Sequence, residues 1–205
     1  MTFQTFRTTF QHYPFFSIKE IEKLYPHFDY KNLGYWQDKK YVQKIRNGHY
    51  CLTENQLDTD TLYFISNQMY APSYISLETA LSHYGFIPEG VFKITAISTL
   101  KTQSFTTPMG VFSYQNLKPN LYFGYQLIPF GEFNFKIADP EKTILDYLYL
   151  HPKLNTEDHF FEMRFNALEI MRQLNLDTLQ HYQLQINSQA LNYRLKILLK
   201  FLKHA

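Results

Sequence analysis

The sequence predicts an α+β protein in two parts, and three observations lead to this class. Short helical patterns and a tight turn between β-prone runs occupy the first 53 residues. Residues 91–138 are rich in β-branched and aromatic residues separated by Pro and Gly, and helical spacing returns after residue 139. We therefore expect a first domain over 1–53 and a second, α/β domain over 54–205, the second with an antiparallel sheet and C-terminal helices.

The composition favours a folded protein of the cytoplasm. Of its 205 residues, 45% are hydrophobic and 19% are charged, which provides enough apolar surface for a packed core. No uncharged apolar run is long enough for a transmembrane helix, and residues 1–10 lack the apolar stretch of a signal peptide. Cys51 is the single cysteine, so we expect neither an internal disulfide nor a Cys-based zinc site.

The first strong local pattern surrounds Ser17. Ser17 and Glu20 have the spacing of a capping box, in which each side chain bonds the other residue's backbone N–H. Phe16 and Ile21 take the two positions of a hydrophobic staple around the same helix start. These signals predict a helix over about residues 18–25.

A second helix is expected after a short connection. Asp29 can cap a helix that continues to about Asp38, with Leu33 and Trp36 on one face. An earlier helix near residues 6–13 would support this pair. Two short helices joined by a few residues form a helix-turn-helix pattern.

A β-hairpin completes this region. Residues 41–46 and 49–52 are β-prone, and Asn47-Gly48 between them is a strong hairpin signal, because both residues of a type I′ turn need positive φ. Helix, turn, helix and hairpin in this order predict a winged helix-turn-helix. In that fold the second helix enters the major groove of DNA and the hairpin is the wing.

The polar residues of these elements suit DNA. Asn can hydrogen-bond adenine twice, Lys can reach guanine or phosphate, and neutralised phosphates release counterions. We expect the DNA contacts on the second helix and the wing, from Tyr30, Lys31, Asn32, Tyr35, Lys39, Lys40, Lys44, Arg46, Asn47 and His49. Two alternatives stay open, since the same bases can simply solvate a surface and winged helices also bind proteins.

The second domain is expected to begin with a linker over residues 53–70, where periodicity is weak. A helix follows between a Ser76 cap and Gly85 at the C′ position, with an apolar stripe of Leu77, Ala80, Leu81 and Tyr84. An antiparallel meander is then predicted, with strands over residues 91–99, 105–107, 111–115, 121–127 and 133–138. Asp139 and Pro140 open another helix, whose buried face is Ile144, Leu145 and Leu148.

Two segments of this region carry a family resemblance. SYISLETALSHYGFIPEGV (residues 73–91) and IADPEKTILDYLYL (residues 137–150), in this order behind a winged helix, resemble the AbiEi antitoxins of type IV toxin–antitoxin systems. The resemblance covers about residues 15–151. It implies an N-terminal winged helix, an α/β C-terminal domain, repression of transcription from inverted repeats in the protein's own operator, and neutralisation of an AbiEii-type nucleotidyltransferase toxin.

The expected partners are therefore operator DNA and a cognate toxin that is opposed directly or functionally. Within the first segment, Tyr74, Glu78 and His83 are the candidates for a toxin interface, whereas capping and packing account for Ser76 and Gly85. The alternative is a winged-helix transcriptional regulator without a toxin, whose C-terminal domain senses a ligand or partner.

We expect no enzymatic activity, catalytic residue, metal or cofactor. The sequence lacks a glycine-rich phosphate loop, a nucleophile elbow and histidines at metal-binding spacing. A metal-dependent nuclease is the remaining enzyme hypothesis, because Asp139, Glu141 and Lys142 lie together. Helix capping and the helix dipole already account for that group.

The C-terminal region is expected to be helical. Thr156 starts a helix that should point Phe161, Phe165 and Leu168 inward, and a shorter helix should run from Asp177 to Tyr182. Ser188 caps the last helix, which has a stripe of Leu191, Leu195, Leu198 and Leu202 and a basic face of Arg194, Lys196, Lys200 and Lys203. That helix either docks on its own domain with a solvated basic face, or contacts DNA, or inserts in a toxin groove.

Charge is unevenly distributed along the chain. Residues 1–52 carry eight bases and four acids, residues 53–150 carry five and nine, and residues 151–205 carry seven and five. The overall charge of +2 thus contains a basic first part and an acidic middle. This asymmetry indicates different partners for different parts, with chance clustering as the alternative.

Overall fold

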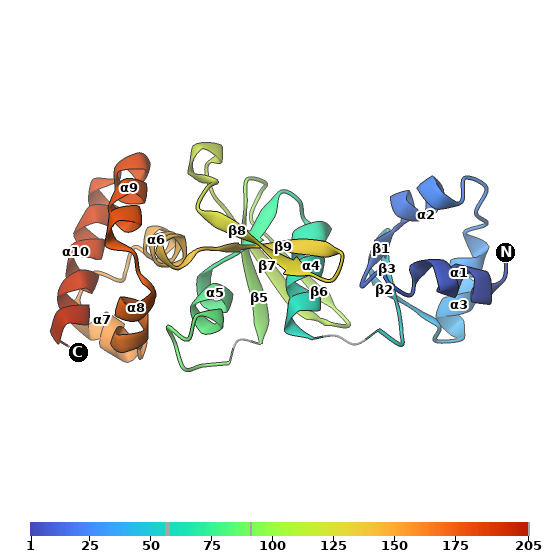
Figure 1. The fold of residues 1–205 in the computed structure, drawn as a ribbon, viewed down its shortest axis with the longest axis horizontal. Helices are drawn as coiled ribbons and strands as arrows, with labels where there is room; N and C mark the ends of the chain where they lie inside the picture. The colour runs from blue at the N-terminus through green and yellow to red at the C-terminus, as the bar shows by residue number, and fades with distance from the viewer. Residues whose placement is uncertain (56–57, 91, 205) are drawn as a thin grey trace.

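A computed structural model describes residues 1–55, 58–90 and 92–204. The molecule is a mixed α+β protein with an elongated shape, in which three blocks follow one another along the long axis (Figure 1). We call these blocks the head (residues 1–55), the body (58–90 and 92–150) and the helical end (157–204). Chain order and spatial order agree, since the N-terminus lies at one end of the molecule and the C-terminus at the other.

The head contains three helices and a small sheet. Its elements are α1 (Phe3–Phe10), β1 (Phe16–Ser17), α2 (Ile18–Leu24), α3 (Lys31–Asp38), β2 (Val42–Arg46) and β3 (His49–Leu52). The strands form an antiparallel sheet in the order β1-β3-β2. The expected capping box is confirmed, because Glu20 N donates to Ser17 Oγ and Ser17 N donates to Glu20 Oε2.

The helix ends in the head differ slightly from the expected ones. Helix α1 begins at Phe3, three residues before the expected start, and its N-cap Thr2 accepts a hydrogen bond from Thr5 N through its side chain. In α3 the N-cap residue is Tyr30 rather than Asp29. The Asp29 carboxylate accepts a hydrogen bond from Lys31 N at 3.0 Å, so it satisfies the first backbone donor from one position further out.

The hairpin has the expected two-residue connection. Arg46 pairs with His49, so Asn47 and Gly48 form the turn. Only Gly48 of the two takes a positive φ, of +78°, so the expectation of positive φ at both residues is wrong. A bulge between Lys44 and Arg46 accompanies this turn, and bulges increase the local strand twist that a primed turn would otherwise provide.

Aromatic side chains form the core of the head. Phe6 is fully buried, and its ring centroid lies 4.5 Å from that of Phe10 and 4.7 Å from that of Trp36. Phe16 and Ile21, the staple pair, are also fully buried in this cluster. Burial of each such side chain stabilises the fold by about 2–3 kcal/mol, so this cluster holds α1, α2 and α3 on the small sheet.

Residues 53–70 do not form a linker. They contain α4 (Thr59–Met69), capped by Asp58, whose side chain accepts from Thr61 N at 2.8 Å. One face of α4 packs on β4 and β9, yet polar Ser66 and Asn67 are also buried there. These buried polar residues interrupt the apolar pattern, which is why the periodicity was too weak to predict a helix. Residues 56–57 of the expected linker lie outside the described residues.

The sheet of the body is mixed. Its strands are β4 (Ser73–Ile75), β5 (Lys93–Ser98), β6 (Gln103–Thr107), β7 (Gly110–Asn116), β8 (Tyr125–Phe130) and β9 (Phe133–Ala138), in the order β6-β7-β5-β4-β9-β8. The expected antiparallel meander is wrong, because β4 pairs parallel with β9 and β5 pairs parallel with β7. All three residues of β4 are buried, so its sequence lacks the alternation that marks a strand.

The bounds of four expected strands also change, since β5, β6, β7 and β8 run over Lys93–Ser98, Gln103–Thr107, Gly110–Asn116 and Tyr125–Phe130. The strand expected from residue 121 begins at Tyr125, since residues Pro119–Leu121 form a short 3₁₀ helix, η1. Val91, the first residue of another expected strand, lies outside the described residues.

Two helices that resemble the expected ones flank the sheet: α5 (Leu77–His83) and α6 (Pro140–Leu150). Gly85 ends α5 with φ of +68°, and Phe86 N donates to Leu81 O at 2.8 Å, as in a Schellman motif. Asp139 caps α6 as expected, accepting from Lys142 N at 2.7 Å. Ser76 does not cap α5 with its side chain, since its hydroxyl donates to Asp146 instead.

The helical end contains α7 (Glu157–Glu162), α8 (Ala167–Gln173), α9 (Leu176–Ile186) and α10 (Gln189–His204). The single helix expected after Thr156 is broken at Arg164, which has a φ of +53°. This break changes the helical phase, so Phe161 and Leu168 are 76% and 82% exposed rather than inward. Phe165 is buried as expected.

Helix α10 docks on its own chain, which is the first of the three roles considered for it from the sequence. Its leucine stripe is buried, and it packs against α6, α7 and α8. Arg194 does not belong to the exposed basic face, because its side chain is buried and its Nε donates to Leu148 O at 2.8 Å.

Candidate nucleic-acid interface

The outer face of α3 is polar and basic. Leu33 and Trp36 turn inward and are only 3% exposed each, so the opposite face points to solvent. Lys31, Tyr35 and Lys39 recur every four residues and form one row along that face. Tyr35 is 58% exposed, and the Lys39 ammonium lies 5.8 Å from the centroid of its ring. The row therefore combines two positive charges with one flat aromatic surface.

Two polar residues flank this row. Asn32 is half-buried in the first turn of α3. The Tyr30 hydroxyl donates a 2.6 Å hydrogen bond to Glu22 Oε1 of α2, and this bond raises the pKa of Tyr30 to about 12. Its phenol is consequently an uncharged group near neutral pH, with its proton directed at Glu22.

The remaining lysines lie near the end of α3 and on the β2–β3 hairpin. Lys40 follows α3 with a positive φ of +58°, and Lys44 is exposed on β2. Within the residues that the structure describes, no ion pair involves Lys31, Lys39, Lys40 or Lys44. Their charges are therefore free to interact with a polyanion.

The tip of the β2–β3 hairpin is less available than expected. Asn47 is exposed, but the His49 ring stacks on Phe15 at 5.1 Å between centroids, and its Nδ1 lies 3.0 Å from Asn47 O. Partial burial lowers the pKa of His49, so its ring carries no positive charge near neutral pH. His49 thus acts in the head as a packed, neutral ring.

Arg46 lies apart from the other basic residues. Its guanidinium carbon is 3.8 Å from the centroid of Phe105 on β6, and its Nη1 donates to Met69 O at 3.0 Å. Both partners belong to the body, so this arginine joins the β2–β3 hairpin to the body. The expected phosphate contact is therefore a poor description of Arg46. No local sequence pattern predicts these contacts, because Met69 and Phe105 are distant from Arg46 along the chain.

The three candidates for a toxin interface do not form one surface. Tyr74 is fully buried, so its expected place at an interface is wrong for this conformation. Glu78 is partly exposed, with its Oε1 3.8 Å from His151 Nε2. His83 is exposed at the end of α5, and the edge of its ring meets Tyr63.

Tyr74 instead belongs to a buried polar network that sequence reasoning missed. Its hydroxyl donates to Asp146 Oδ2 at 2.8 Å and accepts from Lys142 Nζ at 3.0 Å. Lys142 is fully buried and forms an ion pair with Asp146, one helical turn further along α6. Ser76 Oγ also donates to Asp146 Oδ2, at 3.0 Å. The i, i+4 spacing of Lys142 and Asp146 is visible in the sequence, but it is equally typical of an exposed helix face.

The groups considered for catalysis are placed as follows. Asp139 caps α6, and Glu141 Oε1 accepts from Asn175 N at 2.5 Å. Burial raises the pKa of Cys51 to about 12, which keeps this thiol protonated. Among the described residues, no group of three or more His, Cys, Asp and Glu side chains is arranged to hold a metal ion. Across the same residues, no helix is both long and apolar enough to span a membrane.

Comparison with known proteins adds no relative. A scan against protein-family models found no match, and a search of curated proteins likewise found none.

Proposed function

We propose that the head is a winged-helix domain that binds double-stranded DNA, and that the protein represses its own operon as an antitoxin-type regulator. The observation that carries the DNA-binding proposal is the unpaired basic row on α3. Two helices and a hairpin, in the order of a winged helix, surround that row.

The chemistry of the row supports this proposal. Lys31 and Lys39 are separated by eight residues, which is about 12 Å along an α-helix. That span matches a helix lying in a major groove, with a lysine near each end at the phosphates or the guanine edges. Asn32, in the first turn, is the side chain suited to an adenine edge, and Tyr35 and Lys44 add a polar surface and a wing contact.

The test is a gel shift or fluorescence anisotropy titration with duplex DNA from upstream of the gene, measured over a range of salt concentrations. The Lys31→Ala and Lys39→Ala double variant should lower the salt slope by about two, because each phosphate contact contributes about 0.9. Asn32→Ala should weaken operator binding by about 1–3 kcal/mol and leave binding to a random duplex nearly unchanged.

Two matched variants control for charge. Lys118→Ala removes an exposed lysine of the body, and Arg46→Ala removes a half-buried base whose guanidinium lies against Phe105 of the body. Both should leave the salt slope close to that of the wild type. An unchanged slope in the Lys31 and Lys39 double variant would refute the DNA-binding surface proposed here.

The antitoxin part of the proposal rests on the resemblance of residues 73–91 and 137–150 to AbiEi proteins. It predicts a nucleotidyltransferase reading frame next to this gene. Co-expression of the full chain with the product of the adjacent gene should restore growth. The same rescue by a triple variant with Lys31→Ala, Asn32→Ala and Lys39→Ala would separate antitoxicity from DNA binding. Absence of such a gene, or of rescue, favours a regulator without a toxin.

A further inference from the structure

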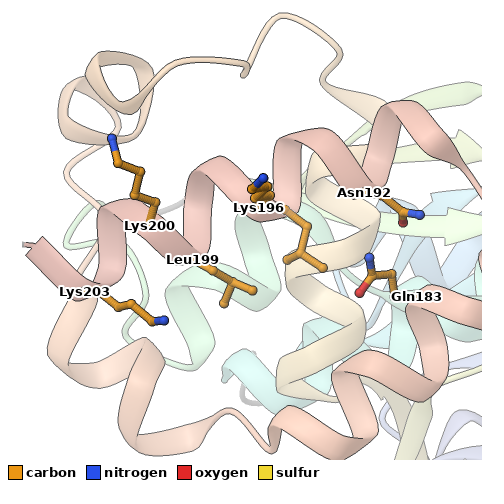
Figure 2. Close-up of a pocket in the computed structure, with 7 residues that line it drawn as sticks. Gln183, Asn192, Lys196, Leu199, Lys200 and Lys203 are labelled. Carbon is orange, nitrogen blue, oxygen red and sulfur yellow. The ribbon is translucent and has the colours of Figure 1, made fainter.

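The helical end contains a hollow with an apolar floor and a basic rim. It has a volume of about 410 Å³, and most of the surface lining it is apolar. Leu199 of α10 supplies the floor, and Lys196, Lys200 and Lys203 supply the rim (Figure 2). Leu195 also lines the hollow, although only 1% of its surface is exposed. Gln183 of α9 forms the opposite wall near Asn192.

The spacing along α10 explains this combination. Lys196, Leu199, Lys200 and Lys203 recur at three and four positions apart, so they share one side of the helix. Leu195 belongs to the buried stripe that packs on α6, α7 and α8 and also lines the hollow, whereas the lysines and the half-buried Leu199 lie on the adjoining side of α10. The hollow is therefore a second face of the same helix, left uncovered after the helix has docked.

Charge in this region is of one sign. After Asp177 the sequence contains four basic residues and no acidic side chain. One acid reaches the rim from another helix, since Glu157 Oε1 of α7 lies 2.5 Å from Lys200 Nζ. Lys196 and Lys203 have no ion pair among the described residues. The rim thus presents unneutralised positive charge around leucine side chains.

A second hollow lies on the other side of the Lys200–Glu157 ion pair, since Lys200 lines the first hollow and Glu157 lines the second. Glu157 forms part of its lining together with the exposed ring of Phe161 and the buried rings of Phe165 and Phe201. Its volume is about 740 Å³. Two apolar hollows thus adjoin at the Lys200–Glu157 pair, an arrangement that suits an amphipathic segment with apolar residues on one face.

We propose that the side of α10 formed by Lys196, Leu199, Lys200 and Lys203 docks an acidic amphipathic segment of a partner protein. Leucine-like residues of that segment enter the hollow, and its carboxylates pair with the three lysines. A nucleic acid would pair its phosphates with the same lysines but would gain nothing from the leucine floor. Charge and floor together therefore favour a peptide, and this inference is independent of DNA binding by the head.

The distance between the lysines defines the probe. Lys196 and Lys203 are seven residues apart, which is about 10 Å or two helical turns. The probe is a fluorescein-labelled helical peptide with Glu at positions i, i+4 and i+7 and a leucine stripe beside them. A second peptide replaces Glu by Lys, and a third keeps Glu but replaces Leu by Ser.

Anisotropy titrations with the full chain should give binding of the acidic leucine peptide and at least about 10-fold weaker binding of the other two. Lys196→Glu together with Lys203→Glu should weaken the acidic peptide by at least about 10-fold, and the matched surface variant Lys118→Glu should not. Glu157→Gln should tighten binding about two-fold to five-fold, because Lys200 loses its internal competitor.

Three results would overturn the proposal. One is equal binding of the acidic and basic peptides. Another is equal binding of the leucine and serine peptides, which would make the surface a site for charge alone. The third is that the Lys196 and Lys203 double variant loses affinity for random duplex DNA while it keeps the peptide. Circular dichroism melting of each variant checks that the helical end is folded in all arms.

Discussion

The lysines of the head and the central lysine of the body occupy opposite environments. Lys31 and Lys39 point to solvent from α3, whereas Lys142 of α6 is fully buried and ion-paired with Asp146. All three carry the same formal charge, yet only the first two extend an electric field outward. In water that field reaches about 8–10 Å at moderate salt, whereas the buried charge is neutralised where it lies.

This difference teaches that charge counted along a sequence does not report the surface. Lys142 and Asp146 both contribute to the count for the acidic middle, although neither faces a partner. Arg46 counts as a base of the head, although its guanidinium is held against Phe105 of the body. The charge of a region becomes informative only when burial and pairing are known.

The largest effect on stability is expected from a substitution that breaks the buried Lys142–Asp146 ion pair. Asp146→Ala leaves the Lys142 ammonium and the hydroxyls of Tyr74 and Ser76 without their shared acceptor. We expect a loss of about 3–5 kcal/mol in the free energy of unfolding, measured by denaturant titration. A double variant with Lys142→Met and Asp146→Leu should lose less, because no buried charge remains unpaired. A loss below about 1 kcal/mol in Asp146→Ala would contradict the burial described here.

An intermediate effect is expected on the pH dependence of stability, and it comes from Asp139, whose carboxyl group caps the start of the same helix. Burial raises the pKa of Asp139 to about 6, although hydrogen bonds from Lys142 N and the Tyr182 hydroxyl act in the opposite direction. The folded state then binds a proton more tightly than the unfolded state, whose value is 3.8. The stability from this group is therefore greatest at low pH and declines as pH rises from about 4 to about 6.

The measurement compares the wild type with Asp139→Asn, which keeps a side-chain cap. Between pH 4 and pH 6 the wild type should lose about 1–2 kcal/mol relative to the variant, a figure reduced for partial solvent screening. If the free energies of unfolding of the two proteins changed equally between pH 4 and pH 6, Asp139 would titrate as it does in water, which would contradict the prediction.

The smallest expected effect is on the head lysines. Lys31→Ala with Lys39→Ala should change the free energy of unfolding by no more than about 0.5 kcal/mol per site, because exposed lysines without ion pairs contribute little to stability. The same double variant should lose DNA affinity, as described above. A stability loss above about 2 kcal/mol would instead make these lysines structural and remove the contrast with Lys142.

Local signals made much of the fold predictable. The capping box of Ser17 and Glu20, the Asn47-Gly48 turn, the Asp139 cap and the Gly85 C′ position depend on residues within a few positions of one another. The leucine stripe of α10 is predictable for a related reason, because leucines spaced three and four residues apart lie on one face of a helix. The exposed row of α3 follows once Leu33 and Trp36 are assigned to the core.

The errors share a different cause. The parallel pairing of β4 and β9 joins strands about 60 residues apart, and no local pattern encodes that partnership. Helix α4 was missed because the chain buries Ser66 and Asn67 together with its apolar residues. Phe161 and Leu168 were expected inside because a single helix was assumed across the left-handed residue Arg164.

The sequence by itself determined where most of its helices begin or end, where its hairpin turns and which helix faces are apolar, because these depend on short-range sterics and hydrogen bonds. The tertiary structure alone decided which charges are exposed. Lys142 is neutralised inside the body, Arg46 joins the β2–β3 hairpin to the body, and the lysines of α3 and α10 remain outside, because long-range packing assigns each charge to protein or to water.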